Sequence, residues 1–125
     1  MAARTASPRS PEGRPTRLSI VLADWCPHCV PLSDVNVRRL ARRLHVPVRR
    51  LDIERPGQLR VADRLVRDHG DRSPDYLIPQ VFLERSDGTV THLLTGFSEE
   101  VARTRRAWRD LLTSDWLRHL ERETR

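Results

Sequence analysis

The stretch IVLADWCPHCVPL, residues 20–32, contains both cysteines of this 125-residue chain, Cys26 and Cys29. The apolar, β-branched run RLSIVLA, residues 17–23, leads directly into them and predicts a buried strand. A Cys-x-x-Cys pair is open to three interpretations: a metal site, a structural disulfide or a redox pair. The elements on either side of the pair bear on that choice.

A helical pattern follows the cysteines. Over residues 33–45 the apolar side chains recur at helical spacing, with arginines on the other face; they are Val37, Leu40, Ala41 and Leu44. Pro31 lies near the start of this segment, where it removes a backbone donor and is expected to kink the helix or delay its regular part. The cysteines therefore stand where a strand passes into a helix.

The rest of the chain alternates strand and helix patterns. We expect strands at 46–54, 79–84 and 89–95, and helices at 56–70 and 99–121. Asp87-Gly88 predicts the turn of a hairpin between the last two strands. Ser98 is the expected N-cap of the last helix.

The last helix has a predicted inner stripe of six residues: Val101, Trp108, Leu111, Leu112, Trp116 and Leu120. Thr113-Ser114-Asp115 offers a point at which this helix can break in two. Gly70 is the expected stop of the preceding helix.

The resulting order, β-α-β-α-β-β-α, predicts an α/β fold. A strand-helix-strand unit gives a parallel pair of strands and a hairpin gives an antiparallel pair. The expected architecture is therefore a four-stranded mixed sheet flanked by helices. Residues 1–16 contain three prolines and little apolar surface, so they are expected to form a disordered tail that leaves 17–125 as one domain.

A redox pair suits this position. A sulfur at a helix N-terminus lies beside unpaired N–H groups and the positive end of the helix dipole, which stabilise a thiolate. Cys26 is then the attacking group, and Cys29 resolves the mixed disulfide. Pro27 suits the first helical position. His28 can carry positive charge or donate a hydrogen bond, so Pro27 and His28 are the residues expected to tune the pKa of the pair.

The other two interpretations have less support. A structural zinc site needs four ligands, and the remaining histidines, 45, 69, 92 and 119, show no ligand spacing. A metal is expected only if two copies of the chain share ligands, so no metal is assigned. A disulfide that closes so short a loop contributes little stability, because the entropic effect grows with loop length.

Several motifs together resemble the thioredoxin superfamily over residues 17–125. ADWCPHC, residues 23–29, is similar to its active-site stretch, and LIPQVFL, residues 77–83, is similar to the segment with its cis-proline. DGTV at 87–90 and TGF at 95–97 resemble its hairpin and the glycine before its last helix. The chain is closest in size to the minimal, glutaredoxin-like form of the fold.

The resemblance implies a thiol-disulfide oxidoreductase. It makes Cys26 the nucleophile, Cys29 the resolving thiol and Pro79 the cis-proline. Ile78 would offer backbone groups to an extended substrate, and Trp25 would shape the surface around Cys26. No cofactor is implied. The implied partners are disulfide-containing proteins and a thiol donor, either a thioredoxin reductase-type protein or glutathione, acting on a monomer.

Composition and charge bear on compartment and partners. All 23 basic residues are arginine, and the net charge is +6. They are scattered among 17 acidic residues, so no nucleic-acid partner is expected. No apolar run is long enough to span a membrane, and no secretory signal is recognisable, which favours the cytoplasm. Pro-His between the cysteines resembles oxidising members of the superfamily, but a cytoplasmic location favours the reducing direction.

Two other functions remain open for the same pair. The first is a non-enzymatic redox sensor or adaptor that docks partners through the arginine-rich first helix and the last helix, with Trp108 and Trp116. The second is a metal carrier that binds copper or zinc through Cys26 and Cys29. Redox-dependent binding without turnover would indicate the sensor, and a copurifying metal would indicate the carrier.

Overall fold

The structure is a computed structural model, and it describes residues 13–97 and 100–124. Most of the predicted tail lies outside these residues, and so do Ser98 and Glu99. The first strand, β1 (Pro15–Leu22), starts two residues before the predicted start at Arg17. Pro15 and Thr16, which the sequence interpretation assigned to the tail, therefore belong to the sheet, where the Thr16 hydroxyl donates to the Glu84 carbonyl at 3.1 Å.

The four strands form one mixed sheet in the order β2-β1-β3-β4. β1 pairs in parallel with β2 (Val48–Asp52) and antiparallel with β3 (Gln80–Arg85), which pairs antiparallel with β4 (Val90–Thr95). The predicted four-stranded mixed sheet flanked by helices is confirmed, in the predicted element order but with the last helix divided into two. Gly88, at φ +86°, makes the predicted hairpin turn, where a residue with a Cβ would be strained.

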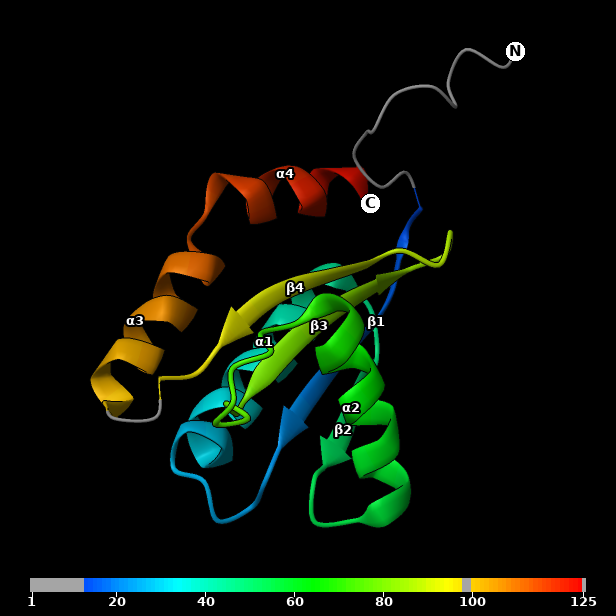
Figure 1. The fold of residues 1–125 in the computed structure, drawn as a ribbon. Helices are drawn as coiled ribbons and strands as arrows, with labels where there is room; N and C mark the ends of the chain where they lie inside the picture. The colour runs from blue at the N-terminus through cyan, green and yellow to red at the C-terminus, as the bar shows by residue number, and fades with distance from the viewer. Residues whose placement is uncertain (1–12, 98–99, 125) are drawn as a thin grey trace.

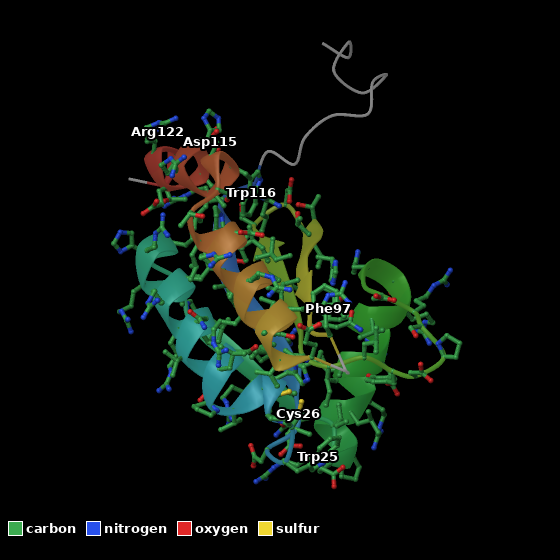
Figure 2. The ribbon with its side chains drawn as sticks, turned by 90° about the vertical axis from the view of Figure 1, so that its left-hand side faces the viewer. Trp25, Cys26, Phe97, Asp115, Trp116 and Arg122 are labelled. Atoms are coloured by element: carbon green, nitrogen blue, oxygen red, sulfur yellow. The ribbon has the colours of Figure 1, made fainter. Side chains whose placement is uncertain are left out.

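Helices cover both faces of the sheet (Figure 1). α1 (Asp34–Leu44) and α3 (Val101–Leu112) lie on one face and α2 (Pro56–His69) on the other, as the turned view shows (Figure 2). α4 (Asp115–Glu123) follows α3 and packs against the end of α1. Arg43 of α1 holds it there: its guanidinium donates to the Leu112 carbonyl at 2.5 Å and to Glu121 at 2.6 Å.

β1, one of the two inner strands, lies between two apolar layers. Leu18 and Ile20 pair with Leu83 and Val81 on the α1 side of the sheet, and all are fully buried. Ser19 and Val21 face α2, on the side of the buried Phe82 ring. These layers hold the carboxyl end of β1, and the cysteines that follow it, at one edge of a rigid core.

The last helix breaks at Thr113 and Ser114, as the sequence predicts. The break changes which residues of the final segment face inward. Leu117 is fully buried, whereas Trp116 is 39% exposed, so the prediction of Trp116 in the inner stripe is wrong. Trp108 is 1% exposed, which rules it out as part of an exposed docking face for a redox adaptor.

Candidate active site

The cysteines lie in a tight turn after β1. The Cys26 N–H donates to the Ala23 carbonyl at 3.1 Å, and the Cys26 carbonyl accepts from the N–H groups of Cys29 and Val30, each at 3.0 Å. Pro27 has helical backbone angles and caps a short helical segment, His28–Ser33. This turn fixes both cysteines at the edge of the sheet core.

The regular helix does not begin at the cysteines. Val30 has an extended backbone (φ −130°, ψ 127°), and α1 starts only at Asp34. The expectation that Cys26 stands at the N-terminus of the long helix is therefore wrong. The reason is Pro31, because a residue before proline is pushed out of the helical region and proline itself lacks an N–H.

The two thiols differ in environment. Cys29 is fully buried, and Cys26 is 5% exposed and lines a cavity beside the turn. Burial raises the pKa of Cys29 well above its ordinary value, and a hydrogen bond to the Cys26 side chain raises it further. A backbone hydrogen bond from Ala23, second in size only to burial, and the weaker charge of Arg50 lower the pKa. Cys29 is thus held as the protonated, interior member of the pair.

The cavity beside Cys26 has a volume of about 400 Å³. Its walls come from two segments far apart in the chain, the turn at residues 25–28 and the loop at residues 75–78. Trp25 is 66% exposed and lies beside Cys26 at the same end of the molecule (Figure 2). On the other wall, the Tyr76 hydroxyl donates to Asp63 at 2.6 Å, which ties the loop to α2.

The loop that carries Ile78 and Pro79 is held against the end of β4. The Ile78–Pro79 peptide bond is cis. The Gly96 N–H donates to the Pro79 carbonyl at 2.8 Å, and a Cβ on Gly96 would lie 2.4 Å from Pro79 Cδ. Ile78 lines the cavity with Cys26, so the structure brings this part of the predicted site together. The substrate-binding role of Ile78 and Pro79 stays a prediction.

His28 lies in an environment that the sequence did not indicate. Its side chain is 5% exposed, and its Nδ1 lies 2.7 Å from the hydroxyl of Thr104 in α3. Its carbonyl accepts a hydrogen bond from Ser33, whose hydroxyl in turn accepts one from the Trp108 indole at 2.7 Å. Sequence reasoning missed Thr104 and Ser33, because a lone hydroxyl in a helical pattern carries no sign of a partner some 75 residues away.

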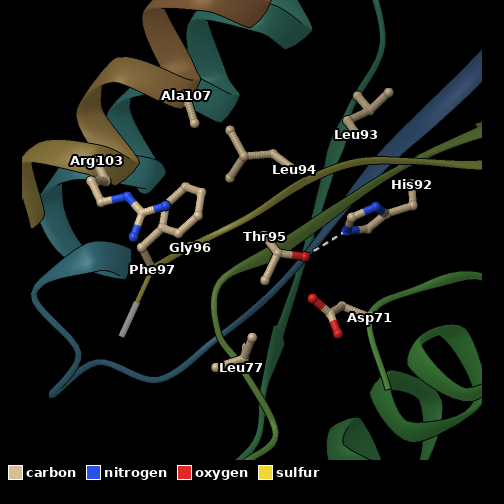
Figure 3. Close-up of a pocket in the computed structure, with 10 residues that line it drawn as sticks. All are labelled: Asp71, Leu77, His92, Leu93, Leu94, Thr95, Gly96, Phe97, Arg103 and Ala107. Carbon is tan, nitrogen blue, oxygen red and sulfur yellow. Dashed lines mark hydrogen bonds between the residues drawn. The ribbon is translucent and has the colours of Figure 1, made fainter. Parts of the chain in front are cut away.

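A second cavity, of about 450 Å³, lies along β4 (Figure 3). His92 and Thr95 line it, with Nε2 and Oγ1 2.7 Å apart, and the Arg103 guanidinium stacks 4.3 Å from the centre of the Phe97 ring. Burial lowers the pKa of His92, although the charge of Asp71 and a backbone hydrogen bond at Leu94 act in the opposite direction. Leu77 lines both cavities, which places them side by side.

Two further observations concern metal ligands and membrane-spanning helices. Over residues 13–97 and 100–124, no group of three or more histidine, cysteine, aspartate or glutamate side chains is arranged to hold a metal ion. In the same part of the chain, no helix has the length and apolar character needed to cross a membrane.

The chain has a recognisable structural neighbour. No protein-family model and no curated protein sequence matches it. Among solved structures it is similar to the C-terminal domain of DsbD from Neisseria meningitidis in the reduced form. The two are 19% identical, the match covers 78% of this chain and 81% of that one, and the TM-score is 0.42.

Proposed function

We propose that this protein is a thiol-disulfide oxidoreductase whose reactive groups are Cys26 and Cys29. The observation that carries the proposal is the asymmetry of the pair. Only Cys26 lines the cavity, while Cys29 is fully buried and its thiol has a raised pKa. In such a pair one sulfur attacks the substrate disulfide, and the other resolves the mixed disulfide that forms.

In the reducing direction, the Cys26 thiolate attacks one sulfur of a substrate disulfide. The S–S bond of the substrate breaks, a mixed disulfide forms, and the substrate's other sulfur leaves as a thiolate that takes up a proton. Cys29 then loses its proton and attacks Cys26, which releases the second substrate sulfur as a thiol. The substrate gains two electrons and two protons, and the Cys26–Cys29 disulfide holds the oxidising equivalents.

The cavity supports disulfide-containing proteins as substrates. Trp25 forms an exposed apolar wall, and the residue 75–78 loop forms the opposite wall within reach of Cys26. A thiol donor, either a thioredoxin reductase-type protein or glutathione, would return the pair to the dithiol. We propose that the protein works in the cytoplasm as a monomer, mainly as a reductant.

The experiment that tests the proposal is a redox titration. The pure protein is equilibrated in glutathione buffers of graded ratio, and the Cys26–Cys29 disulfide is measured by thiol trapping and mass. A reduction potential near or below about −230 mV would support a cytoplasmic reductant. A potential above about −180 mV would reverse the direction to oxidant or isomerase. Failure to form a reversible disulfide would contradict the function itself, and the metal carrier or sensor would then be tested.

A further inference from the structure

The hydroxyl of Thr104 makes two hydrogen bonds, and the buried one joins α3 to the dithiol turn. Its Oγ1 accepts from the Phe97 N–H at 2.9 Å and lies 2.7 Å from Nδ1 of His28. Thr104 is fully buried and His28 is 5% exposed, so water does not compete freely for the bond between them. His28, one of the two residues between the cysteines, is thus hydrogen-bonded to a helix that begins more than 70 residues later.

The two bonds favour one position for the ring hydrogen of His28, since the Thr104 hydroxyl needs an acceptor for its own hydrogen. A threonine hydroxyl has one hydrogen to donate, and its oxygen accepts from Phe97 here. Thr113, at the end of α3, donates to the carbonyl four residues earlier, Arg109, but no such bond is found for Thr104 among the described residues. The acceptor that remains for the Thr104 hydrogen is Nδ1 of His28. Nδ1 is then unprotonated, and the ring hydrogen is on Nε2.

We propose that Thr104 is a positioning residue of the dithiol site: it holds His28 as the neutral Nε2–H tautomer and so withholds positive charge from the neighbouring thiols. The inference rests on the proposed function of Cys26 and Cys29. A neutral His28 beside the thiols would be consistent with the proposed reducing direction.

The direction of the effect follows from charge. A cation beside the pair stabilises the thiolate of the reduced form, which makes the disulfide easier to reduce and the protein more oxidising. An imidazole whose Nδ1 accepts a hydrogen bond cannot take its second proton without breaking that bond. Removing the Thr104 hydroxyl therefore raises the reduction potential of the Cys26–Cys29 couple.

The first test compares Thr104→Val, which keeps the shape but loses the hydroxyl, with Thr104→Ser, which keeps the hydroxyl. In glutathione buffers, Thr104→Val should shift the equilibrium constant of the pair toward the dithiol by about tenfold, equivalent to about 30 mV. Thr104→Ser should restore the wild-type value. In a His28→Leu background, Thr104→Val should have no effect. An equal shift in both backgrounds would mean that Thr104 acts through Phe97, and no shift in either would also overturn the proposal.

The second test does not depend on redox activity. Nitrogen-15 NMR of histidine-labelled reduced protein, with the His28 signals assigned from His28→Leu, should show an unprotonated Nδ1 and a protonated Nε2. A hydrogen on Nδ1 in the wild-type protein would overturn the proposal even if Thr104→Val failed to fold. If the tautomer is as proposed but no reversible disulfide forms, the proposed function fails while the positioning of His28 by Thr104 stands.

Discussion

Gly96 lies so close to Pro79 that no side chain fits between them. A Cβ at Gly96 would lie 2.4 Å from Pro79 Cδ and 3.0 Å from the Ile78 carbonyl oxygen. The end of β4 and the loop that walls the Cys26 cavity are therefore in direct backbone contact, reinforced by the hydrogen bond from the Gly96 N–H to the Pro79 carbonyl. The position of the cavity wall depends on this contact.

Replacing Gly96 with alanine should displace that loop. The proline ring is rigid, so the strain cannot be relieved by a side-chain rotation, and we expect a loss of about 1–3 kcal/mol in the free energy of unfolding. Turnover of a protein disulfide should fall with it, since Ile78 shares the cavity with Cys26. Gly57→Ala is the matched control, because nothing lies within 4 Å of its added Cβ. Equal denaturant midpoints for the two variants would contradict the crowding at Gly96.

Substituting each cysteine alone should distinguish the attacking thiol from the resolving thiol. Cys29→Ser should accumulate a mixed disulfide with a substrate protein, because the resolving thiol is gone, whereas Cys26→Ser should form none. In the reduced wild-type protein, Cys29 should be alkylated much more slowly than Cys26, since it is fully buried and its pKa is raised. Mass spectrometry of trapped species measures both. A mixed disulfide trapped by Cys26→Ser would reverse the assignment.

Trp25 should contribute to substrate binding rather than to the free energy of unfolding. It is 66% exposed beside Cys26, so Trp25→Ala should change the free energy of unfolding by less than about 0.5 kcal/mol. We expect kcat/KM for a protein disulfide to fall about tenfold, equivalent to about 1.4 kcal/mol of lost binding. Trp116, 39% exposed and on α4, provides the control, and Trp116→Ala should leave kcat/KM unchanged. An equal loss of kcat/KM in Trp25→Ala and Trp116→Ala would mean that Trp25 is not part of the substrate-binding surface.

Glu84 should make stability depend on acid pH. Burial alone would raise the pKa of Glu84, but hydrogen bonds from Arg17 and Ser19 and the charges of Arg49 and Arg17 outweigh it and hold the pKa below its ordinary value of 4.5. Because the folded-state pKa is the lower one, ionised Glu84 stabilises the fold above pH 4.5, and this contribution is lost as the pH falls through the folded-state pKa.

The corresponding variant is Glu84→Gln, which keeps the shape and removes the charge. At neutral pH it should unfold more easily by about 2 kcal/mol, the scale of charged hydrogen bonds, and the difference from wild type should shrink in acid. Glu123→Gln removes an exposed carboxylate paired with His119 and should have little effect. Urea unfolding at several pH values measures both, and a difference that is constant with pH would argue against the ionised Glu84.

Much of the fold could be predicted from local patterns. The apolar run before the cysteines, the helix stripes and the Asp87-Gly88 turn each have a short-range physical cause, and the strands and helices formed where those causes predicted them. α1 lies at Asp34–Leu44, within the predicted segment 33–45, and Pro31 delays the regular helix as expected. The placing of Cys26 at its N-terminus was wrong, because proline restricts Val30 and the regular helix starts eight residues after Cys26.

The final segment shows where a local pattern misleads. A continuous helix would align Trp116 with Trp108, but the break at Thr113 and Ser114 resets the helical phase. Leu117 and Leu120 then face inward in α4, and Trp116 turns outward. Periodicity predicts a buried face only within one unbroken helix.

By itself, the sequence determined the element order, the sheet and the pair of cysteines at the end of β1, because strand, helix and turn preferences act over a few residues. The tertiary structure decided which sulfur reaches the cavity, that Gly96 lies against Pro79, and that His28 is bonded to Thr104. Those relationships join residues up to 76 positions apart. These residues meet only because α3 and the residue 75–78 loop pack against the dithiol turn. Local sequence preferences cannot predict such a contact.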